Sequence, residues 1–265
     1  MVALSPADDI VRSLDMNGRG FVVIGAGQGI GAATCRALRG LGADVLCVDN
    51  DRERGEAIAQ VVQSECVLAD VTKREDVERV FARAHATLGS SLSGVVDIVG
   101  MAQTGPLGAL DDADWDRQFD IVLRHAFLTI QIGGEALAAR GGGAMAFVGS
   151  LAGTLSIAGQ AAYGTAKAAL HHLVEVSAHE YGPRNVRVNA VAPGFVRTPR
   201  LMRFGNEFWD DISSRLPLRR PAEPEDIAKT LVFLVSDMST CMTGAIVPLD
   251  GGITKVVAVP GFLGR

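Results

Sequence analysis

The chain alternates short runs of β-branched and aliphatic residues with longer segments of helical periodicity. The runs are almost continuously apolar, which is typical of strands covered on both faces rather than on one. Strand–helix alternation of this kind favours right-handed crossovers and a parallel, doubly wound sheet. The sequence predicts strands at 21–24, 44–49, 66–68, 95–99, 144–148, 186–191 and 245–248, and the first two helices at 29–41 and 52–62.

One α/β domain is the better count for this chain. It has 265 residues, of which 48% are apolar, enough for a large core. No Pro/Ser-rich linker and no repeat of fixed period interrupts it. We therefore expect a single domain over 1–265, with residues 1–18 as an N-terminal extension.

Charge and composition exclude several classes of partner. The net charge is −5, and no run of Lys/Arg exceeds two residues, so no nucleic-acid partner is expected. No segment resembles a signal peptide or a membrane helix of about 18 apolar residues, which predicts a cytoplasmic protein without a membrane partner. Four cysteines occur singly, without metal-ligand spacing to histidine, so no metal site is predicted.

A glycine-rich turn joins the first predicted strand to the first helix. Gly25, Gly29 and Gly31, with Gln28 and Ile30 between them, fit a G-x-x-x-G-x-G spacing but not G-x-G-x-x-G. Glycines here permit positive φ and let the backbone approach a pyrophosphate, which the helix N-terminus stabilises. The turn is either a tight turn alone or, given its position after the first strand, a dinucleotide site.

An acidic residue ends the second predicted strand. Asp49 lies 18 residues after Gly31, where a carboxylate would bind the adenosine ribose hydroxyls and repel a 2′-phosphate. This favours NAD over NADP. Two alternatives remain: Asp49 only caps the following helix, or the nearby Arg52 and Arg54 accommodate the phosphate.

One of only two tyrosines is followed by a lysine four residues later. Tyr163 and Lys167 would share a helix face, with the ammonium beside the phenol. Lowering the phenol pKa from about 10 to about 7 takes about 4 kcal/mol, which Lys167 and a nicotinamide ring would supply. Tyr163 would then be the general acid or base. Ser150, at the end of the predicted strand 144–148, would hold the substrate oxygen. The alternative for Tyr163 and Lys167 is that they only form a contact on the surface of a helix.

Together these motifs resemble the classical short-chain dehydrogenase/reductase family over nearly the whole chain. The resemblance rests further on the segments 189–194 and 244–252 and on Thr198. It implies a single-domain Rossmann-type sheet of seven strands with helices on both faces, hydride exchange with an alcohol or carbonyl, and dimers or tetramers. It makes Ser150, Tyr163 and Lys167 catalytic, and assigns cofactor contacts to Gly25, Gln28, Gly29, Ile30, Gly31, Asp49, Asp70, Val71, Tyr163, Lys167, Pro193, Gly194, Val196 and Thr198.

The chain departs from the family pattern at three places. Ile24 replaces a Thr, and the family's Asn-Asn-Ala-Gly is replaced by Asp97-Ile98-Val99-Gly100. Val122 stands where the family has a fourth catalytic residue, an Asn that orders a water for proton exchange with the lysine. The Val122 carbonyl or His125 are possible substitutes, although a packed or solvent-facing His125 is the favoured interpretation. Two further histidines are interpreted as structural: His171 and His172.

The segment 198–217 is expected to form a lid over the substrate. Its apolar side chains either cover a hydrophobic alcohol or ketone or pack a short helix. Arg200 and Arg203 either face water or meet an acidic group such as a CoA phosphate. Small residues around Tyr163 and an apolar tail at 256–263 predict self-association, which the resemblance implies to be a homotetramer or homodimer. The lid residues in question are Leu201, Met202, Phe204, Phe208 and Trp209.

The predicted function is that of an NAD-dependent short-chain alcohol dehydrogenase or carbonyl reductase. Its substrate would be a small hydrophobic secondary alcohol or ketone. One alternative is a 3-oxoacyl-thioester reductase that uses NADPH. A second alternative is an NAD-binding protein with weak or no catalysis, because Val122 replaces the family's Asn.

Overall fold

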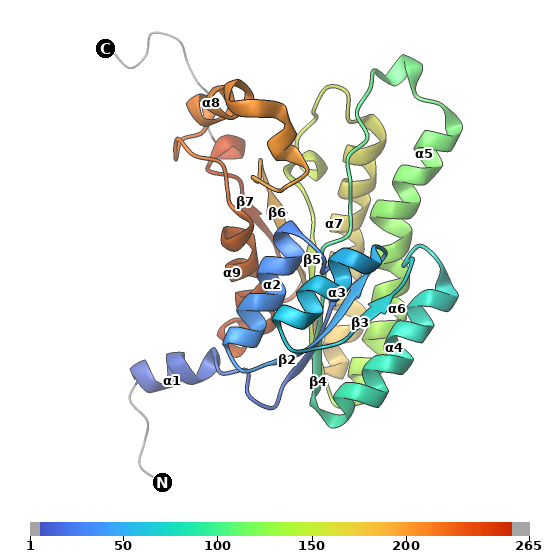
Figure 1. The fold of residues 1–265 in the computed structure, drawn as a ribbon, viewed down its shortest axis with the longest axis vertical. Helices are drawn as coiled ribbons and strands as arrows, with labels where there is room; N and C mark the ends of the chain where they lie inside the picture. The colour runs from blue at the N-terminus through green and yellow to red at the C-terminus, as the bar shows by residue number, and fades with distance from the viewer. Residues whose placement is uncertain (1–5, 256–265) are drawn as a thin grey trace.

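Seven strands pair in parallel in the order β3-β2-β1-β4-β5-β6-β7, in a computed structural model that describes residues 6–255 (Figure 1). The predicted doubly wound parallel sheet is therefore confirmed. The strands are β1 (Gly20–Ile24), β2 (Asp44–Asp49), β3 (Cys66–Leu68), β4 (Leu92–Asp97), β5 (Gly143–Val148), β6 (Val186–Pro193) and β7 (Ile246–Leu249).

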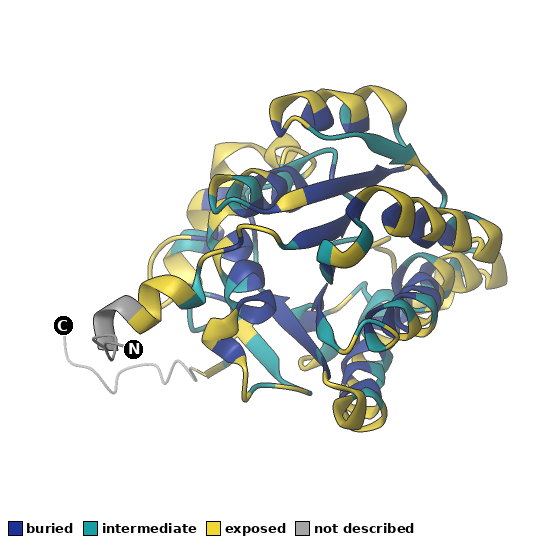
Figure 2. Ribbon diagram, turned by 90° about the horizontal axis from the view of Figure 1, so that it is seen from below, coloured by how far each residue is buried: buried dark blue, intermediate teal, exposed yellow. Residues whose placement is uncertain are grey.

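Helices cover both faces of the sheet. One face carries α2 (Gly29–Gly40), α3 (Arg52–Val61) and α9 (Pro224–Val235), and the other carries α4 (Arg74–Leu88), α6 (His125–Ala138) and α7 (Ala161–Tyr181). Figure 2 shows buried strands between helices whose outer sides are exposed. Because side chains alternate along a strand, Val23 packs on the face covered by α2, α3 and α9, while Val22 and Ile24 pack on the face covered by α4, α6 and α7.

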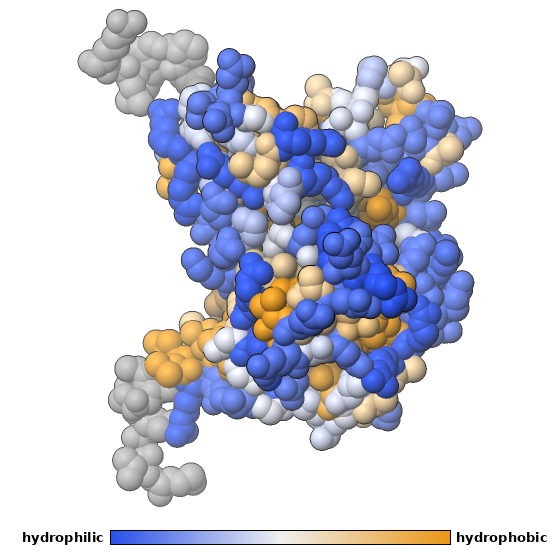
Figure 3. Space-filling view, in the orientation of Figure 1, coloured by the Kyte–Doolittle hydropathy of each residue, from blue (hydrophilic) through white to orange (hydrophobic). Residues whose placement is uncertain are grey.

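The strand order reverses between β1 and β4, which directs the following segments to opposite faces. Such a switch point is where parallel sheets bind ligands, beyond the carboxyl ends of the strands. Two helices lie beyond this edge, at the top of Figure 1: α5 (Asp112–Phe119) and α8 (Gly205–Arg215). A short helix, α1 (Pro6–Ser13), projects from the opposite end, where Figure 3 shows apolar surface. Ile10 and Val11 of this helix are exposed.

One strand boundary differs from its prediction in a way that matters for the site. β4 ends at Asp97 rather than at Val99, because Asp97 Oδ1 accepts a hydrogen bond from the Val99 backbone N–H at 3.0 Å. This contact turns the chain out of the sheet. Among residues 6–255, no helix has the length and apolar character needed to cross a bilayer. The apolar tail at 256–263 lies outside the described residues.

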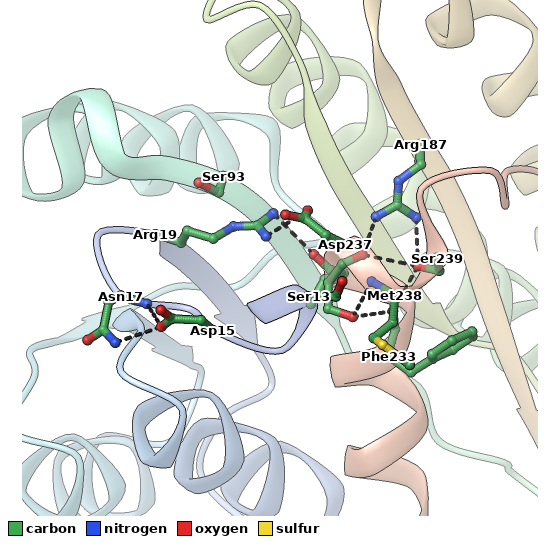
Figure 4. Close-up of polar contacts among 12 residues, drawn as sticks. Ser13, Asp15, Asn17, Arg19, Ser93, Arg187, Phe233, Asp237, Met238 and Ser239 are labelled. Carbon is green, nitrogen blue, oxygen red and sulfur yellow. Dashed lines mark hydrogen bonds and ion pairs between the residues drawn. The ribbon is translucent and has the colours of Figure 1, made fainter. Parts of the chain in front are cut away.

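Two arginines fasten the segment after α9 to the amino-terminal edge of the sheet (Figure 4). Arg19 donates to Asp237 Oδ1 at 2.9 Å. The half-buried guanidinium of Arg187, on β6, donates to a group of oxygens at 2.9–3.3 Å, those of Leu234, Ser236, Ser239 and Met242. Burial lowers the pKa of Arg187.

We predict that Arg187→Met destabilises the protein by at least about 2 kcal/mol, because hydrogen bonds to charged groups contribute about 1.5–3 kcal/mol each. The control is Arg184→Met, which removes an exposed ion pair with Glu135 and should leave stability nearly unchanged. Urea denaturation of both variants measures the difference. Equal losses would contradict this account of Arg187.

Candidate active site

The turn between β1 and α2 has a backbone that requires glycine. Gly25 and Gly29 have φ values of +80° and +54°, in the left-handed region. A Cβ on Gly31 would overlap the carbonyl oxygen of Gly25. The turn is fixed against β2, since the N–H groups of Gly25 and Ala26 both donate to Val48 O, at 2.8 and 3.0 Å.

The N-terminus of α2 fits a bound pyrophosphate. Its N-cap residue, Gln28, makes no side-chain cap hydrogen bond, so the first turn of the helix is left open to an anion. Thr198 and Pro199 approach the same turn, at 3.5 Å from the position of a Cβ on Gly29. The glycine turn and the segment after β6 are therefore neighbours, as a dinucleotide site requires.

Asp49 is tied to the glycine turn rather than to the helix that follows it. It is buried, and its Oδ2 accepts from Gly27 N at 2.7 Å while its Oδ1 accepts from Asp51 N at 2.9 Å. The N-cap of α3 is Asp51, whose carboxylate accepts from Arg54 N. The alternative that Asp49 caps this helix is therefore wrong. Arg54 pairs with Asp51 at 3.2 Å, and Arg52 pairs with Glu56 in solvent.

The remaining predicted cofactor residues lie after β3 and β6. Asp70 Oδ1 accepts from the Thr72 hydroxyl at 2.7 Å, and Val71 is buried. Val196 forms an isolated bridge with Ala222. The structure thus places Asp70, Val71, Gly194, Val196 and Thr198 just after these strands, with Pro193 as the last residue of β6. The contacts of all six with a cofactor stay a prediction.

Lys167 reaches from α7 to the end of β5. Its ammonium donates to Val148 O at 2.7 Å and lies 5.8 Å from the centre of the Tyr163 ring. Burial lowers the pKa of Lys167 to about 8, while the charge of Asp97 acts in the opposite direction. Burial raises the pKa of Tyr163, and a hydrogen bond with the Ser150 side chain opposes this. The expected lowering of the phenol pKa is therefore not a property of the chain alone.

A histidine that the sequence analysis took as structural orients Ser150. His171 Nε2 accepts a hydrogen bond from Ser150 N at 3.3 Å. Gly149 and Gly153 make room for the ring, because a Cβ on either would overlap it. Burial, and then the Lys167 charge, lower the pKa of His171 to about 4. The imidazole is thus neutral near pH 7 and keeps the lone pair that this contact needs.

The region of the family's fourth catalytic residue is a single π-helical turn, Asp120–Arg124. Val122 within it is fully buried. His125, which follows, is also buried and places Nε2 3.1 Å from Asp97 Oδ1. The expectation of a packed His125 is confirmed, with a carboxylate partner that the sequence analysis did not identify.

Known proteins resemble this chain over most of its length. A family model described as enoyl-(acyl carrier protein) reductase matches residues 25–254. A cis-4-hydroxycyclohexanecarboxylate dehydrogenase of Sinomonas cyclohexanicum is 35% identical over 89% of this chain and 96% of its own. A (3R)-3-hydroxyacyl-CoA dehydrogenase of Mus musculus is 30% identical over 88% and 95%. The crystallised 7α-hydroxysteroid dehydrogenase, complexed with NADH and 7-oxo glycochenodeoxycholic acid, is 25% identical, covers 94% and 98%, and has a TM-score of 0.88.

The chain belongs to the classical short-chain dehydrogenase/reductase family. It is an oxidoreductase of that family, and the fold supports a nicotinamide cofactor. Ser150, Tyr163 and Lys167 come together at the carboxyl edge of β5 in this dehydrogenase/reductase. The sequence analysis did not identify the contact of His171 with Ser150. The one sequence signal for it is that His171 follows Lys167 by four residues, which places both on the same face of α7.

The predicted lid of this short-chain dehydrogenase/reductase contains α8, and its apolar residues differ in their surroundings. Met202 and Phe204 are exposed, whereas Trp209 is 2% exposed and packs beneath the Arg197 guanidinium. Phe208 lies between Phe204 and Trp209, with ring centres at 5.0 and 5.1 Å. Trp209 is therefore part of the core, and the outer aromatic residues are the ones available to a ligand.

Two hollows flank the first turn of α7, next to Tyr163. One of about 120 Å³ is lined by residues that include Thr104, Pro106, Leu110 and Ala162. The other, of about 300 Å³, includes Leu155, Ile157, Ala161 and Gly164 in its lining. The smaller hollow therefore lies beside Ala162, the residue that precedes Tyr163.

We predict that His171→Phe lowers kcat and destabilises the protein by about 1–3 kcal/mol, because the Ser150 N–H loses its acceptor. In the parent, the pKa of His171 is about 4 when folded and about 6.5 when unfolded. The unfolded state therefore binds more protons, and stability falls as the pH drops from about 6.5 through 4.

This part of the acid sensitivity should be absent from His171→Phe, as urea denaturation at pH 7 and pH 5 would measure. The matched control is His172→Phe, because the His172 side chain is 78% exposed. This substitution should change neither kcat nor the loss of stability between pH 7 and pH 5. An unaltered acid dependence in His171→Phe would contradict the assignment of a neutral, buried imidazole.

Proposed function

We propose that this chain is an NAD-dependent alcohol dehydrogenase or carbonyl reductase that acts on hydrophobic, carbocyclic secondary alcohols and their ketones. The proposal is carried by one observation, the convergence of Ser150, Tyr163 and Lys167 at the end of β5. A base, its activating cation and a hydroxyl anchor are the groups that alcohol oxidation needs.

Each of these side chains has a distinct task in the proposed mechanism. Ser150 Oγ binds the substrate oxygen, with its backbone held by His171. Tyr163 takes the hydroxyl proton during oxidation and returns it during ketone reduction. Lys167 stabilises the phenolate by its charge and is kept in place by Val148 O. When bound, the nicotinamide supplies the acceptor or donor of the hydride.

The substrate class is inferred from two of the related proteins and from the lid. The names of the cyclohexanecarboxylate and steroid dehydrogenases both describe hydroxyl groups on carbocycles. In the segment 198–217, Met202 and Phe204 offer exposed apolar surface for such a ring. A panel of cyclohexanols and hydroxysteroids with NAD tests the proposal. No turnover by a chain that still binds NAD would favour the alternative of a binding protein, motivated by Val122.

A second candidate is a 3-oxoacyl-thioester reductase that uses NADPH. It is favoured by the relationship to a hydroxyacyl-CoA dehydrogenase and by Arg200 and Arg203, two cations of the predicted lid. Preference for NADPH and for an acyl thioester over every cyclic ketone would select it.

Assembly and location complete the proposal. The small residues Ala161, Gly164 and Ala168 follow one face of α7 and line the larger hollow, so that a second copy can approach closely. We propose a homodimer or homotetramer that works in the cytoplasm, and analytical ultracentrifugation measures the oligomeric state.

We predict that Tyr163→Phe loses at least about 100-fold in kcat while NADH binding remains nearly intact, because general acid–base catalysis contributes about 10²–10⁴-fold. Tyr181→Phe is the control, since it removes the other phenol, whose hydroxyl donates to Gln131 O at the far end of α7. It should retain the parent's rate. Activity of Tyr163→Phe within a few-fold of the parent would exclude Tyr163 as the acid or base.

We predict that the parent binds NADH at least about tenfold more tightly than NADPH, a difference of about 1.4 kcal/mol. Asp49→Asn should narrow this ratio, because it removes the charge that repels a 2′-phosphate and leaves an oxygen acceptor for Asp51 N. Asp44→Asn, on the exposed start of β2, should leave the ratio unchanged. Fluorescence titration with both cofactors provides the measurement, and equal affinities in the parent would overturn the NAD assignment.

A further inference from the structure

Asp97, the last residue of β4, has a carboxylate that is buried. The side chain is fully buried, in contact with the equally enclosed His125 at 3.1 Å. Its Oδ1 also accepts from Val99 N, whereas Oδ2 has no partner among the described residues. The hydrogen bond from Val99 N, which turns the chain out of β4, uses only Oδ1. It therefore does not explain why this position carries a second carboxylate oxygen, Oδ2.

Lys167 is a buried cation whose ammonium is held at the end of β5, the strand that pairs with β4. Asp97 lies opposite Phe147 in the parallel register of β4 and β5, one residue before Val148, whose carbonyl holds the ammonium. Neighbouring strands are about 4.8 Å apart. A Cβ on Gly100, three residues after Asp97, would lie 2.9 Å from Lys167 Nζ, so the turn after β4 is shaped around the ammonium.

A buried ammonium needs a compensating charge. Lys167 is 1% exposed, and Val148 O satisfies one of its three N–H groups. Burial of an uncompensated lysine favours its neutral form, which has no charge to stabilise a phenolate. The Asp97 charge opposes the effect of burial on the pKa of Lys167.

We propose that Asp97, oriented by His125, is a positioning residue whose carboxylate is the counter-charge that keeps Lys167 protonated beside Tyr163. The proposal rests on the function proposed for Lys167, but the effect of the Asp97 charge on Lys167 can be measured without turnover. It also gives a joint role to Asp97, a departure from the family pattern, and to His125, in a chain that has Val122 in place of the family's Asn.

The titratable groups around Lys167 come from three elements. β4 contributes Asp97, α6 contributes His125 through its contact with Asp97, and α7 itself contributes Tyr163 and His171. Asp97 is the carboxylate in this set. Its removal should therefore lower the pKa of Lys167.

The decisive experiment is an NMR titration of the chain labelled with ¹³C-lysine. The chain has four lysines, so the spectrum is simple, and Lys167→Met identifies the signal. Asp97→Asn keeps the oxygen acceptor for Val99 N and should lower the pKa of Lys167 by about 1 or more, because a nearby opposite charge moves a pKa by about 1–3.

The matched control is Asp250→Asn. Asp250 is also buried, and its Oδ1 accepts from the N–H two residues later, Gly252 N at 2.8 Å, as Asp97 does from Val99. This variant should leave the pKa of Lys167 unchanged. If Asp97→Asn does not fold, Asp97→Ser is a second way to remove the charge, since serine also forms such turns.

An unchanged Lys167 pKa in either folded Asp97 variant overturns the proposal. So does a value below about 7 in the parent, because burial would then act unopposed. That second criterion requires no variant.

A pH profile of alcohol oxidation separates this proposal from the proposed function. The alkaline limb of kcat/KM should move to lower pH in Asp97→Asn by the amount seen for Lys167 by NMR. A purely structural role would lower kcat without moving the limb and would contradict the proposal. An NMR shift in a chain that oxidises no alcohol would instead refute the proposed function and leave the counter-charge standing.

Discussion

The sheet is covered by helices on both faces, and its buried carboxylates lie where the strands end. Asp49 ends β2, Asp97 ends β4, and Asp250 follows β7, all of them buried. Lys167 reaches the same edge from α7 to bind Val148 O. Enclosure of the strands lowers the effective dielectric around these groups, which makes each charge there matter more than it would on the surface.

Sequence patterns predicted the sheet well because both of its determinants are local. Apolar continuity identified the strands, and the glycine turn identified where the first crossover begins. The end of β4 was predicted two residues late, because the apolar run continues through Ile98 and Val99. That continuity hides the turn that Asp97 makes with Val99 N.

The candidate site was only partly predictable, since several of its contacts join distant residues. Tyr163 and Lys167 form a local helical pattern that the sequence displays. The contact between Asp97 and His125 spans 28 residues, and that between Ser150 and His171 spans 21. Neither pair has a spacing that a sequence pattern encodes, so the sequence analysis did not connect Asp97 with His125. Burial of Trp209 could not be predicted from the sequence, because other apolar residues of the same segment, Met202 and Phe204, are exposed.

The buried charges at this edge act on one another in series. Asp97 opposes the loss of charge by Lys167, and the Lys167 charge in turn lowers the pKa of His171. In the proposed mechanism, a protonated Lys167 would therefore serve both neighbours, stabilising a phenolate at Tyr163 and keeping His171 neutral as an acceptor for Ser150 N. If Lys167 were neutral, the acid–base group would lose its activator and the pKa of His171 would rise. The anchor and the base consequently depend on the same ammonium, and the fold maintains that charge with a carboxylate from the neighbouring strand.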